Sequence, residues 1–184
     1  MRDRRGDIPE IPGCRLVDIR RFEDPRGSFE ELFRSEWFPG AFSSESQVNL
    51  SVSEPGVVRG LHFHRRQSDF WVLLEGCLHT ALVDLRRGSP AFRRSLMLRQ
   101  DSGNRKGLLI PPGVAHGYAT IERSALLYVV SSLYDGSDEH GVAWDDPSLG
   151  LDWRLEGRLP VVSARDLSNP LVADLPEDSL VDFQ

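Results

Sequence analysis

Short apolar runs alternate with turn signals over most of the chain. Glycine, proline, serine and aspartate cluster between the runs, as in PPG at 111–113 and DGSD at 135–138. The runs themselves are VNLSVS, VVRGLHFH, FWVLLEG, LHTALVDL, SLMLR, GLLIP, HGYATI and ALLYVVSSLY. This pattern predicts an all-β sandwich or small barrel, and the absence of long helical periodicity between the runs argues against a wound α/β sheet. Short peripheral helices are expected, one within 28–38 and others, together with loops, within 139–184.

The alternation of side chains along a strand assigns polar residues to the same face. His62 shares a face with His64, and His116 shares one with Tyr118. Tyr128 lies on the same face of its run as Val130, Ser132 and Tyr134. A small barrel normally fills its interior with apolar side chains, so a polar interior predicts a ligand cavity.

Length and composition fit one domain. The 184 residues are 40% hydrophobic, and we expect a single domain over 1–184 with an N-terminal arm (about 1–12) and a C-terminal wrapping tail (about 154–184). The net charge of −6 argues against a nucleic-acid partner. No run reaches membrane-spanning length, and Cys14 and Cys77 fit free thiols, so we expect no membrane partner and a cytoplasmic protein.

The spacing of the histidines resembles the metal-binding motifs of the cupin superfamily. Gly56, His62, His64, Asp69 and Gly76 fit the first motif, G-x5-H-x-H-x4-E-x6-G, with Asp for Glu. Pro111, Gly113 and His116 fit the second, although Arg105 and Thr120 depart from its usual ends. The resemblance implies a jelly-roll barrel (double-stranded β-helix). Three imidazoles and a carboxylate suit Zn²⁺, Fe²⁺ or Mn²⁺, and the alternative is a polar pocket without metal.

A longer series of motifs resembles one narrower family. In order, these are DPRGSFEELF, QVNLSVS, GVVRGLHFH, LVDLRRGSPAF, IPPGVAHGY, LLYVVSSLY, WDDPSLGLDW and VSARD, and they are similar to the dTDP-4-dehydrorhamnose 3,5-epimerase family over roughly residues 10–172. This is a metal-free branch of the cupins. The resemblance implies an enzyme without a cofactor that epimerises a dTDP-4-keto-6-deoxyhexose, and it implies a homodimer.

The chemistry of epimerisation accounts for three residues. Protons at C3 and C5, beside the 4-keto group, are weakly acidic because an enolate delocalises the charge, so the reaction needs a base on one ring face and an acid on the other. By resemblance His62 is the base, Asp166 orients it and stabilises its cation, and Tyr128 is the acid.

The resemblance also implies residues that bind the nucleotide sugar. Arg59 and Arg26 are expected to hold the diphosphate, with Arg26 reaching in from a partner subunit. Simple alternation turns Arg59 away from His62, but a bulge at Gly60 could redirect it. The other expected substrate-binding residues are Phe29 beside thymine, Glu31, Gln47 and Asn49, Tyr134 in the sugar pocket, Asp69 and His116. Asp84 and His116 are a further possible pair.

One position departs from the family. Relatives commonly carry a lysine that holds the enolate oxygen, and Asp69 stands in its place within RRQSD. Arg65 or Arg66 could replace the lysine, the substrate or the number of epimerised centres could differ, or Asp69 could complete a metal site with His62, His64 and His116. We expect the metal-free epimerase. The alternatives are a sugar-nucleotide-binding cupin with little activity and a metal-dependent cupin enzyme.

Overall fold

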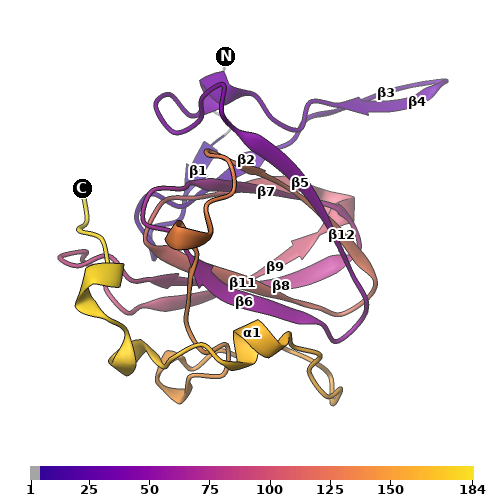
Figure 1. Ribbon diagram of the computed structural model, residues 1–184. Coiled ribbons are helices and arrows are strands. Elements are labelled where there is room, and N and C mark those ends of the chain that lie inside the picture. Colours follow the sequence, from indigo (N-terminus) through magenta and orange to yellow (C-terminus); the bar gives the residue numbers. More distant parts are fainter. Residues whose placement is uncertain (1–4) are drawn as a thin grey trace.

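Two antiparallel sheets face each other and form a flattened barrel (Figure 1). The computed structural model describes residues 5–184, so the first four residues of the expected N-terminal arm lie outside it. The six-stranded sheet has the order β1 (Arg5–Asp7), β2 (Arg15–Asp18), β10 (Lys106–Ile110), β7 (Asp69–Glu75), β12 (Ser124–Val130) and β5 (Gln47–Ser53). The five-stranded sheet has the order β13 (His140–Gly141), β6 (Val58–Phe63), β11 (Val114–Thr120), β8 (Cys77–Asp84) and β9 (Ser95–Asp101).

All eight apolar runs form strands of these sheets, which confirms the expected all-β jelly roll. The helix expected within 28–38 is wrong for most of that range. β3 (Arg21–Asp24) and β4 (Gly27–Glu30) form a hairpin that projects from the barrel (Figure 1), and only Ser35–Trp37 makes one turn of 3₁₀ helix.

Helical structure is confined to single turns outside the sheets. The other 3₁₀ turns cover Ser102–Asn104, Gly136–Asp138, Pro147–Leu149, Val172–Asp174 and Glu177–Ser179, and the one α-helical turn among the described residues is α1 (Ala164–Leu167). No helix within 5–184 has both the length and the apolarity that a membrane span requires.

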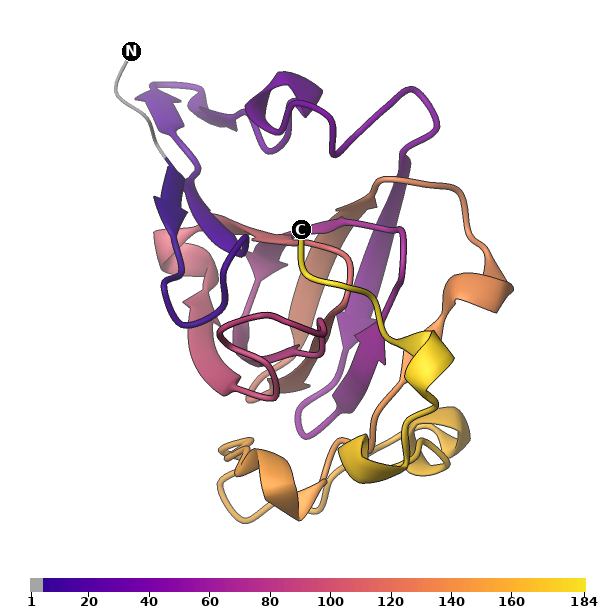
Figure 2. The ribbon, with the colours of Figure 1, turned by 90° about the vertical axis from the view of Figure 1, so that its left-hand side faces the viewer.

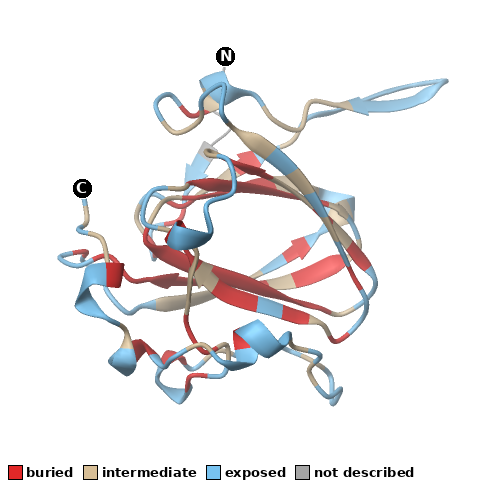
Figure 3. Cartoon of the chain, in the orientation of Figure 1, coloured by how far each residue is buried: buried red, intermediate tan, exposed pale blue. Residues whose placement is uncertain are grey.

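Three apolar clusters hold the layers together. The first lies between the sheets and includes Leu82, Leu108 and Leu126. The second covers the outer face of the five-stranded sheet, where Leu61 and Phe63 pack with residues of the C-terminal segment that include Trp153 and Val172. The third covers the outer face of the six-stranded sheet beneath Phe38. Figure 3 shows buried residues along both sheets and exposed ones in the projecting hairpin.

The C-terminal segment therefore packs on the barrel. In Figure 2 its orange and yellow turns gather at one side of the sheets, and α1 lies beside β6. The burial of Trp153 and Val172 removes apolar surface from water on both the sheet and the segment, and this stabilises the attachment. As a result, a residue near position 166 can contact strand β6, more than a hundred positions earlier in the chain.

Candidate functional site

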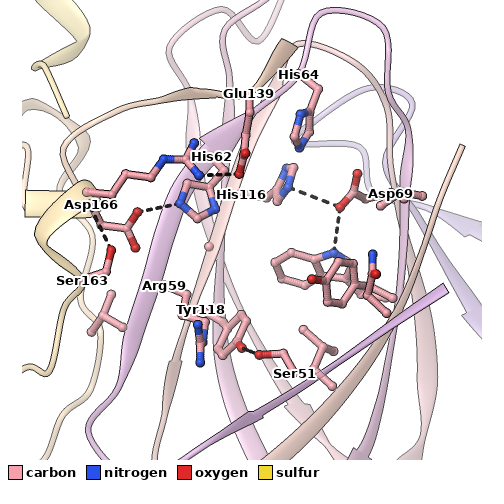
Figure 4. A pocket seen from close by; sticks show the side chains of 18 of the residues that line it. Ser51, Arg59, His62, His64, Asp69, His116, Tyr118, Glu139, Ser163 and Asp166 are labelled. Atoms are coloured by element: carbon pink, nitrogen blue, oxygen red, sulfur yellow. Dashed lines mark hydrogen bonds and ion pairs between the residues drawn. The ribbon is translucent and has the colours of Figure 1, made fainter. Parts of the chain in front are cut away.

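A cavity of about 720 Å³ lies between the two sheets (Figure 4). Its walls are polar because inward-facing positions of β5, β6, β7, β11 and β12 carry polar side chains, while their neighbours face outward. Nine of the expected site residues line it: Gln47, Asn49, Arg59, His62, Asp69, His116, Tyr128, Tyr134 and Asp166. The polar interior inferred from strand alternation is present.

A bulge in β6 explains how Arg59 and His62 reach the same cavity. Opposite β11, His62 pairs with His116 but Arg59 pairs with Tyr118, so the register shifts by one residue between them. Gly60 has φ +119°, and a Cβ there would lie 2.7 Å from the Cα of Gly117. Only glycine fits this position, and the bulge we expected there turns Arg59 into the pocket.

His62 and Asp166 form a hydrogen-bonded pair at one wall. His62 Nε2 lies 2.7 Å from Asp166 Oδ1, and the Gly60 N–H donates to Asp166 Oδ2 at 3.2 Å. Burial raises the pKa of the Asp166 carboxyl, but the hydrogen bond and charge of His62 together with the Gly60 N–H outweigh burial and leave this pKa below its ordinary value. The carboxylate is therefore ionised at neutral pH and can orient and stabilise a histidine cation.

Local sequence fixes Asp166 in this position. Ser163 caps α1 by accepting a hydrogen bond at 3.1 Å from the Asp166 N–H. Ser-x-x-Asp before a helical turn is a capping pattern, and this signal in SARD could have located the short helix from the sequence. The cap holds the start of α1 so that the carboxylate of Asp166 turns toward β6.

A second set of polar groups surrounds Asp69, which projects from β7 of the facing sheet. Asp69 accepts hydrogen bonds from Gln67 Nε2 at 2.8 Å and from Trp71 Nε1 at 3.2 Å, and its Oδ2 lies 3.6 Å from His116 Nε2. Burial lowers the pKa of His116 to about 4, while the neighbouring charge of Asp69 opposes this shift. His116 is therefore a neutral imidazole beside a carboxylate.

Two expectations about this wall are wrong. Arg65 and Arg66 do not line the cavity, and the Arg66 guanidinium pairs with Asp135 at 2.7 Å instead of Asp69. The suggested pair of Asp84 and His116 is also absent, because Asp84 is buried at the end of β8 and holds the Arg86 guanidinium at 2.7 Å. Neither arginine of RRQSD is placed to replace the family's lysine.

Tyr128 stands on β12, in the sheet that faces His62. Its side chain is half-buried, and it lines the same cavity as the His62–Asp166 pair. Burial raises the pKa of the Tyr128 hydroxyl, and the charge of Asp69 raises it further. The phenol therefore keeps its proton at neutral pH and is available as a donor.

Three expected binding residues lie outside the cavity of their own chain. Arg26, Phe29 and Glu31 belong to the projecting hairpin and the segment after it. Arg26 pairs with Asp24 at 2.6 Å, and Glu31 pairs with Arg34. Phe29 is 68% exposed, which is unusual for a large aromatic side chain.

One charged pair at the cavity was not predicted from the sequence. Arg165 Nη1 lies 2.5 Å from Glu139 Oε1, and both residues line the pocket. Burial raises the pKa of Glu139, but the hydrogen bond and charge of Arg165 outweigh it and lower the pKa overall. Arg165 directly precedes Asp166, which was expected at the site. This position next to an expected site residue is the sequence signal that could have indicated that Arg165 lies at the cavity.

Three side chains could hold a metal ion. His64, Asp69 and His116 each offer one ligand atom, and these atoms all lie within 4.8 Å of one another. His62, the fourth member of the suggested metal set, is not in this group and turns its Nε2 to Asp166. The four-residue set inferred from motif spacing is therefore not assembled as one group, although His62 and His116 face each other on the paired strands β6 and β11.

Comparisons with known proteins identify the family. The family model described as dTDP-4-dehydrorhamnose 3,5-epimerase matches residues 9–174. A dTDP-4-dehydrorhamnose 3,5-epimerase from Streptomyces griseus is 34% identical over 178 residues, which cover 93% of this chain and 88% of that protein. A dTDP-4-dehydrorhamnose 3-epimerase from Streptomyces niveus is 34% identical over 178 residues, covering 93% of this chain and 85% of that protein.

A solved structure agrees with the sequence matches. The crystal structure of a dTDP-6-deoxy-D-glucose-3,5-epimerase from Legionella pneumophila, in complex with dTDP-4-keto-L-rhamnose, has a TM-score of 0.89 to this chain at 27% identity and covers 98% of each chain. The resemblance seen in the motifs thus extends to the whole fold. This chain belongs to the dTDP-4-dehydrorhamnose 3,5-epimerase family.

Proposed function

We propose that this protein epimerises a dTDP-4-keto-6-deoxyhexose at C3, at C5 or at both. The observation that carries the proposal is the 2.7 Å contact of His62 with the buried carboxylate of Asp166 inside the cavity of a member of this family. A base that is oriented by a carboxylate is what proton removal beside a ketone requires. The Streptomyces niveus relative is a 3-epimerase, so either one or two centres fit the family.

The two sheets present the acid and the base from opposite sides. His62 projects from β6 of the five-stranded sheet and Tyr128 from β12 of the six-stranded sheet, and both line the cavity between them. A sugar ring held between the sheets has one face toward each. His62 removes the proton from one face, the charge spreads into the enolate, and Tyr128 returns a proton to the other face, which inverts the centre.

Cationic side chains in the cavity suit the diphosphate of the substrate. Arg59 and Arg165 both line it, and guanidinium groups bind phosphate oxygens through paired hydrogen bonds. Arg59 Nε donates to Ser53 Oγ at 3.0 Å, which holds the side chain in place before the substrate arrives. Gln47, Asn49 and Tyr134, at the same cavity, are proposed to contact the nucleoside or the sugar.

The same proposal includes a homodimer in which Arg26 and Phe29 of one protomer enter the pocket of its partner. Its support is that neither residue lines the pocket of its own chain and that the hairpin carrying them projects from the barrel (Figure 1). The outer face of edge strand β5 adds exposed apolar surface, since Val48 and Leu50 are each 62% exposed. The buried free thiols of Cys14 and Cys77 support a reducing cytoplasmic setting.

The measurement that tests the epimerase function is solvent exchange. The purified protein is incubated in D₂O with dTDP-4-keto-6-deoxyglucose, and NMR follows deuterium at C3 and C5. We expect incorporation at one or both carbons together with an inverted product. A binding cupin with little activity, the alternative that Asp69 at the lysine position favours, would bind dTDP and incorporate no deuterium above the rate without enzyme.

A further inference from the structure

Two imidazoles and a carboxylate converge beside the catalytic pair without belonging to it. His64 follows β6, Asp69 begins β7 and His116 lies in β11, so the three side chains come from the two facing sheets (Figure 4). Each residue offers one possible ligand atom, and these three atoms all lie within 4.8 Å of one another. Asp69 and His116 are buried and His64 is half-buried.

Hydrogen bonds to carbonyl groups leave the same nitrogen of both histidines free to bind an ion. His64 Nδ1 lies 3.0 Å from the Asp138 carbonyl oxygen, and His116 Nδ1 lies 3.0 Å from the Val114 carbonyl oxygen. A carbonyl only accepts, so in each neutral ring Nδ1 carries the proton and Nε2 keeps its lone pair. Histidines that ligate metals are usually oriented in this way, with the other ring nitrogen donating to a carbonyl or carboxylate.

The third group is held as an acceptor as well. Asp69 Oδ1 accepts from Gln67 Nε2 and Oδ2 accepts from Trp71 Nε1, and these bonds fix the carboxylate with Oδ2 at 3.6 Å from His116 Nε2. Two ligand atoms that share a tetrahedral ion at ordinary bond lengths lie about 3.4 Å apart. His116 Nε2 and Asp69 Oδ2 are close to this distance apart, so both atoms could bind the same cation.

We propose that His64, Asp69 and His116 form a binding site for one divalent transition-metal ion. Two imidazole nitrogens and one carboxylate oxygen suit Zn²⁺, Mn²⁺, Fe²⁺ or Co²⁺, and coordination positions remain open toward the cavity. The site departs from the metal-free pocket that the family resemblance implied. It also removes the conflict between ligand and base, because His62 is paired with Asp166 and stays free for proton transfer.

The role of the ion in catalysis rests on the epimerase function proposed above, whereas the binding does not. The resemblance implies that relatives commonly hold the enolate oxygen with a lysine at this position, and Asp69 alone would repel negative charge there. A bound divalent ion supplies positive charge at this wall of the cavity, so the cluster and its ion together replace what the lysine provides.

The test is metal binding by the untagged, chelator-treated full chain, with Co²⁺ as the probe. We expect saturable binding of about one Co²⁺ per chain, a visible absorption band from the bound ion, and a higher melting temperature when Co²⁺ is present. His64→Gln, Asp69→Asn and His116→Gln should each weaken binding about 100-fold. His62→Gln and the distant His79→Gln are the matched controls and should bind Co²⁺ like the wild type.

Two results would overturn the proposal: no saturable Co²⁺ binding by the wild type, or binding that survives in all three ligand variants. If His116→Gln does not fold, the half-buried His64 still provides the test, with circular dichroism and dTDP binding as checks of folding. Asp69→Lys, which restores the family's residue, should also lose the ion. Wild-type protein that exchanges deuterium but binds no ion would refute this site alone, and the reverse result would refute only the epimerase function.

Discussion

The two walls of the cavity differ in what their polar groups are paired with. At the β6 wall, His62 is joined to an ionised carboxylate that is itself held by a backbone N–H and placed by a capped helical turn. At the β7 wall, Asp69 receives neutral N–H donors and faces the neutral ring of His116. The first wall is equipped to accept a proton, and the second has a carboxylate without a side-chain cation.

If the protein works as proposed, this difference separates the proton-transfer groups from the group that would stabilise the enolate. Proton transfer needs only the pair of His62 and Asp166 with a donor opposite, and all three positions match the family's motifs. Stabilisation of the enolate needs positive charge, and Asp69 stands where the resemblance implies a lysine that would supply it. Substitutions can test this contrast between the proton-transfer residues and the wall that carries Asp69.

The largest effect is expected at the base. His62→Ala should lower deuterium exchange at C3 and C5 by about 10³–10⁴-fold, because the substitution removes the imidazole that is hydrogen-bonded to the Asp166 carboxylate and is proposed as the base. Binding of dTDP should stay close to wild type, since most of the binding energy is expected to come from contacts with the nucleotide. Exchange that stays within roughly tenfold of wild type, a barrier change of only about 1.4 kcal/mol, would show that His62 is not the base.

Asp166→Asn should show that the orienting carboxylate acts through His62. We expect kcat to fall about 10²–10³-fold with little change in KM, because the amide keeps the size of the side chain and loses the charge that stabilises the histidine cation. Asp166→Glu restores the charge and should recover part of the rate. Equal losses in both variants, or a rise in KM alone, would assign Asp166 a structural or binding role.

Asp84 provides the contrasting carboxylate, buried outside the cavity. Burial raises its pKa, but hydrogen bonds from Arg86 and Ser89 and the charge of Arg86 outweigh burial and lower it below 3.8. Asp84→Asn leaves the guanidinium without its partner and should reduce the free energy of unfolding by about 3 kcal/mol, measured in urea.

The pH dependence of this loss follows from the direction of the shift. A carboxyl with a lowered folded pKa contributes stability that is complete above its ordinary value of 3.8 and disappears as pH falls through the folded pKa. The difference between wild type and Asp84→Asn should therefore be full at pH 6 and shrink below about pH 4. The Asp84→Asn variant, while it is folded, should retain deuterium exchange. A loss of exchange without a loss of folding would instead link Asp84 to the catalytic site.

Tyr128→Phe should separate proton removal from proton return. The ring and its packing remain, and only the donor hydroxyl is lost. We expect formation of the inverted product to fall about 10²-fold while deuterium exchange from the His62 side persists. Epimerisation at the wild-type rate would exclude Tyr128 as the acid.

The smallest effect is expected from the hairpin. Arg26→Ala should weaken dTDP binding about tenfold, close to 1.4 kcal/mol, without changing the melting temperature, because the side chain is exposed in its own chain. Arg21→Ala, in the same hairpin, serves as the control. A clean monomer in sedimentation at micromolar concentration would remove the basis for this prediction.

The sequence was sufficient where short-range physics decides. Alternation within each run placed His62, His116 and Tyr128 on inward faces, and Gly60 marked the bulge that brings Arg59 beside them. These inferences need only the two-residue period of a strand and the backbone freedom of glycine.

The missed features depend on contacts between distant segments. The end of strand β4, residues 28–30, was included in a helix expected within 28–38. That range carries helix-compatible acids and aromatics, and the pairing of Arg21 with Glu30 is not visible locally. His116 was suggested as a possible partner of Asp84, but the carboxylate beside it is that of Asp69, which comes from the facing sheet. Motif spacing likewise could not reveal that His62 turns away from the other three suggested ligands.

The separation of His62 from Asp166 by 104 positions has a consequence for protein synthesis. The ribosome delivers the chain from its N-terminus, so every strand of both sheets has been made before α1 appears. A nascent chain that ends before Ser163 already contains the cavity strands and Tyr128, yet its histidine has no carboxylate to orient it. The capacity for proton transfer therefore arises last, when the final segment docks against β6.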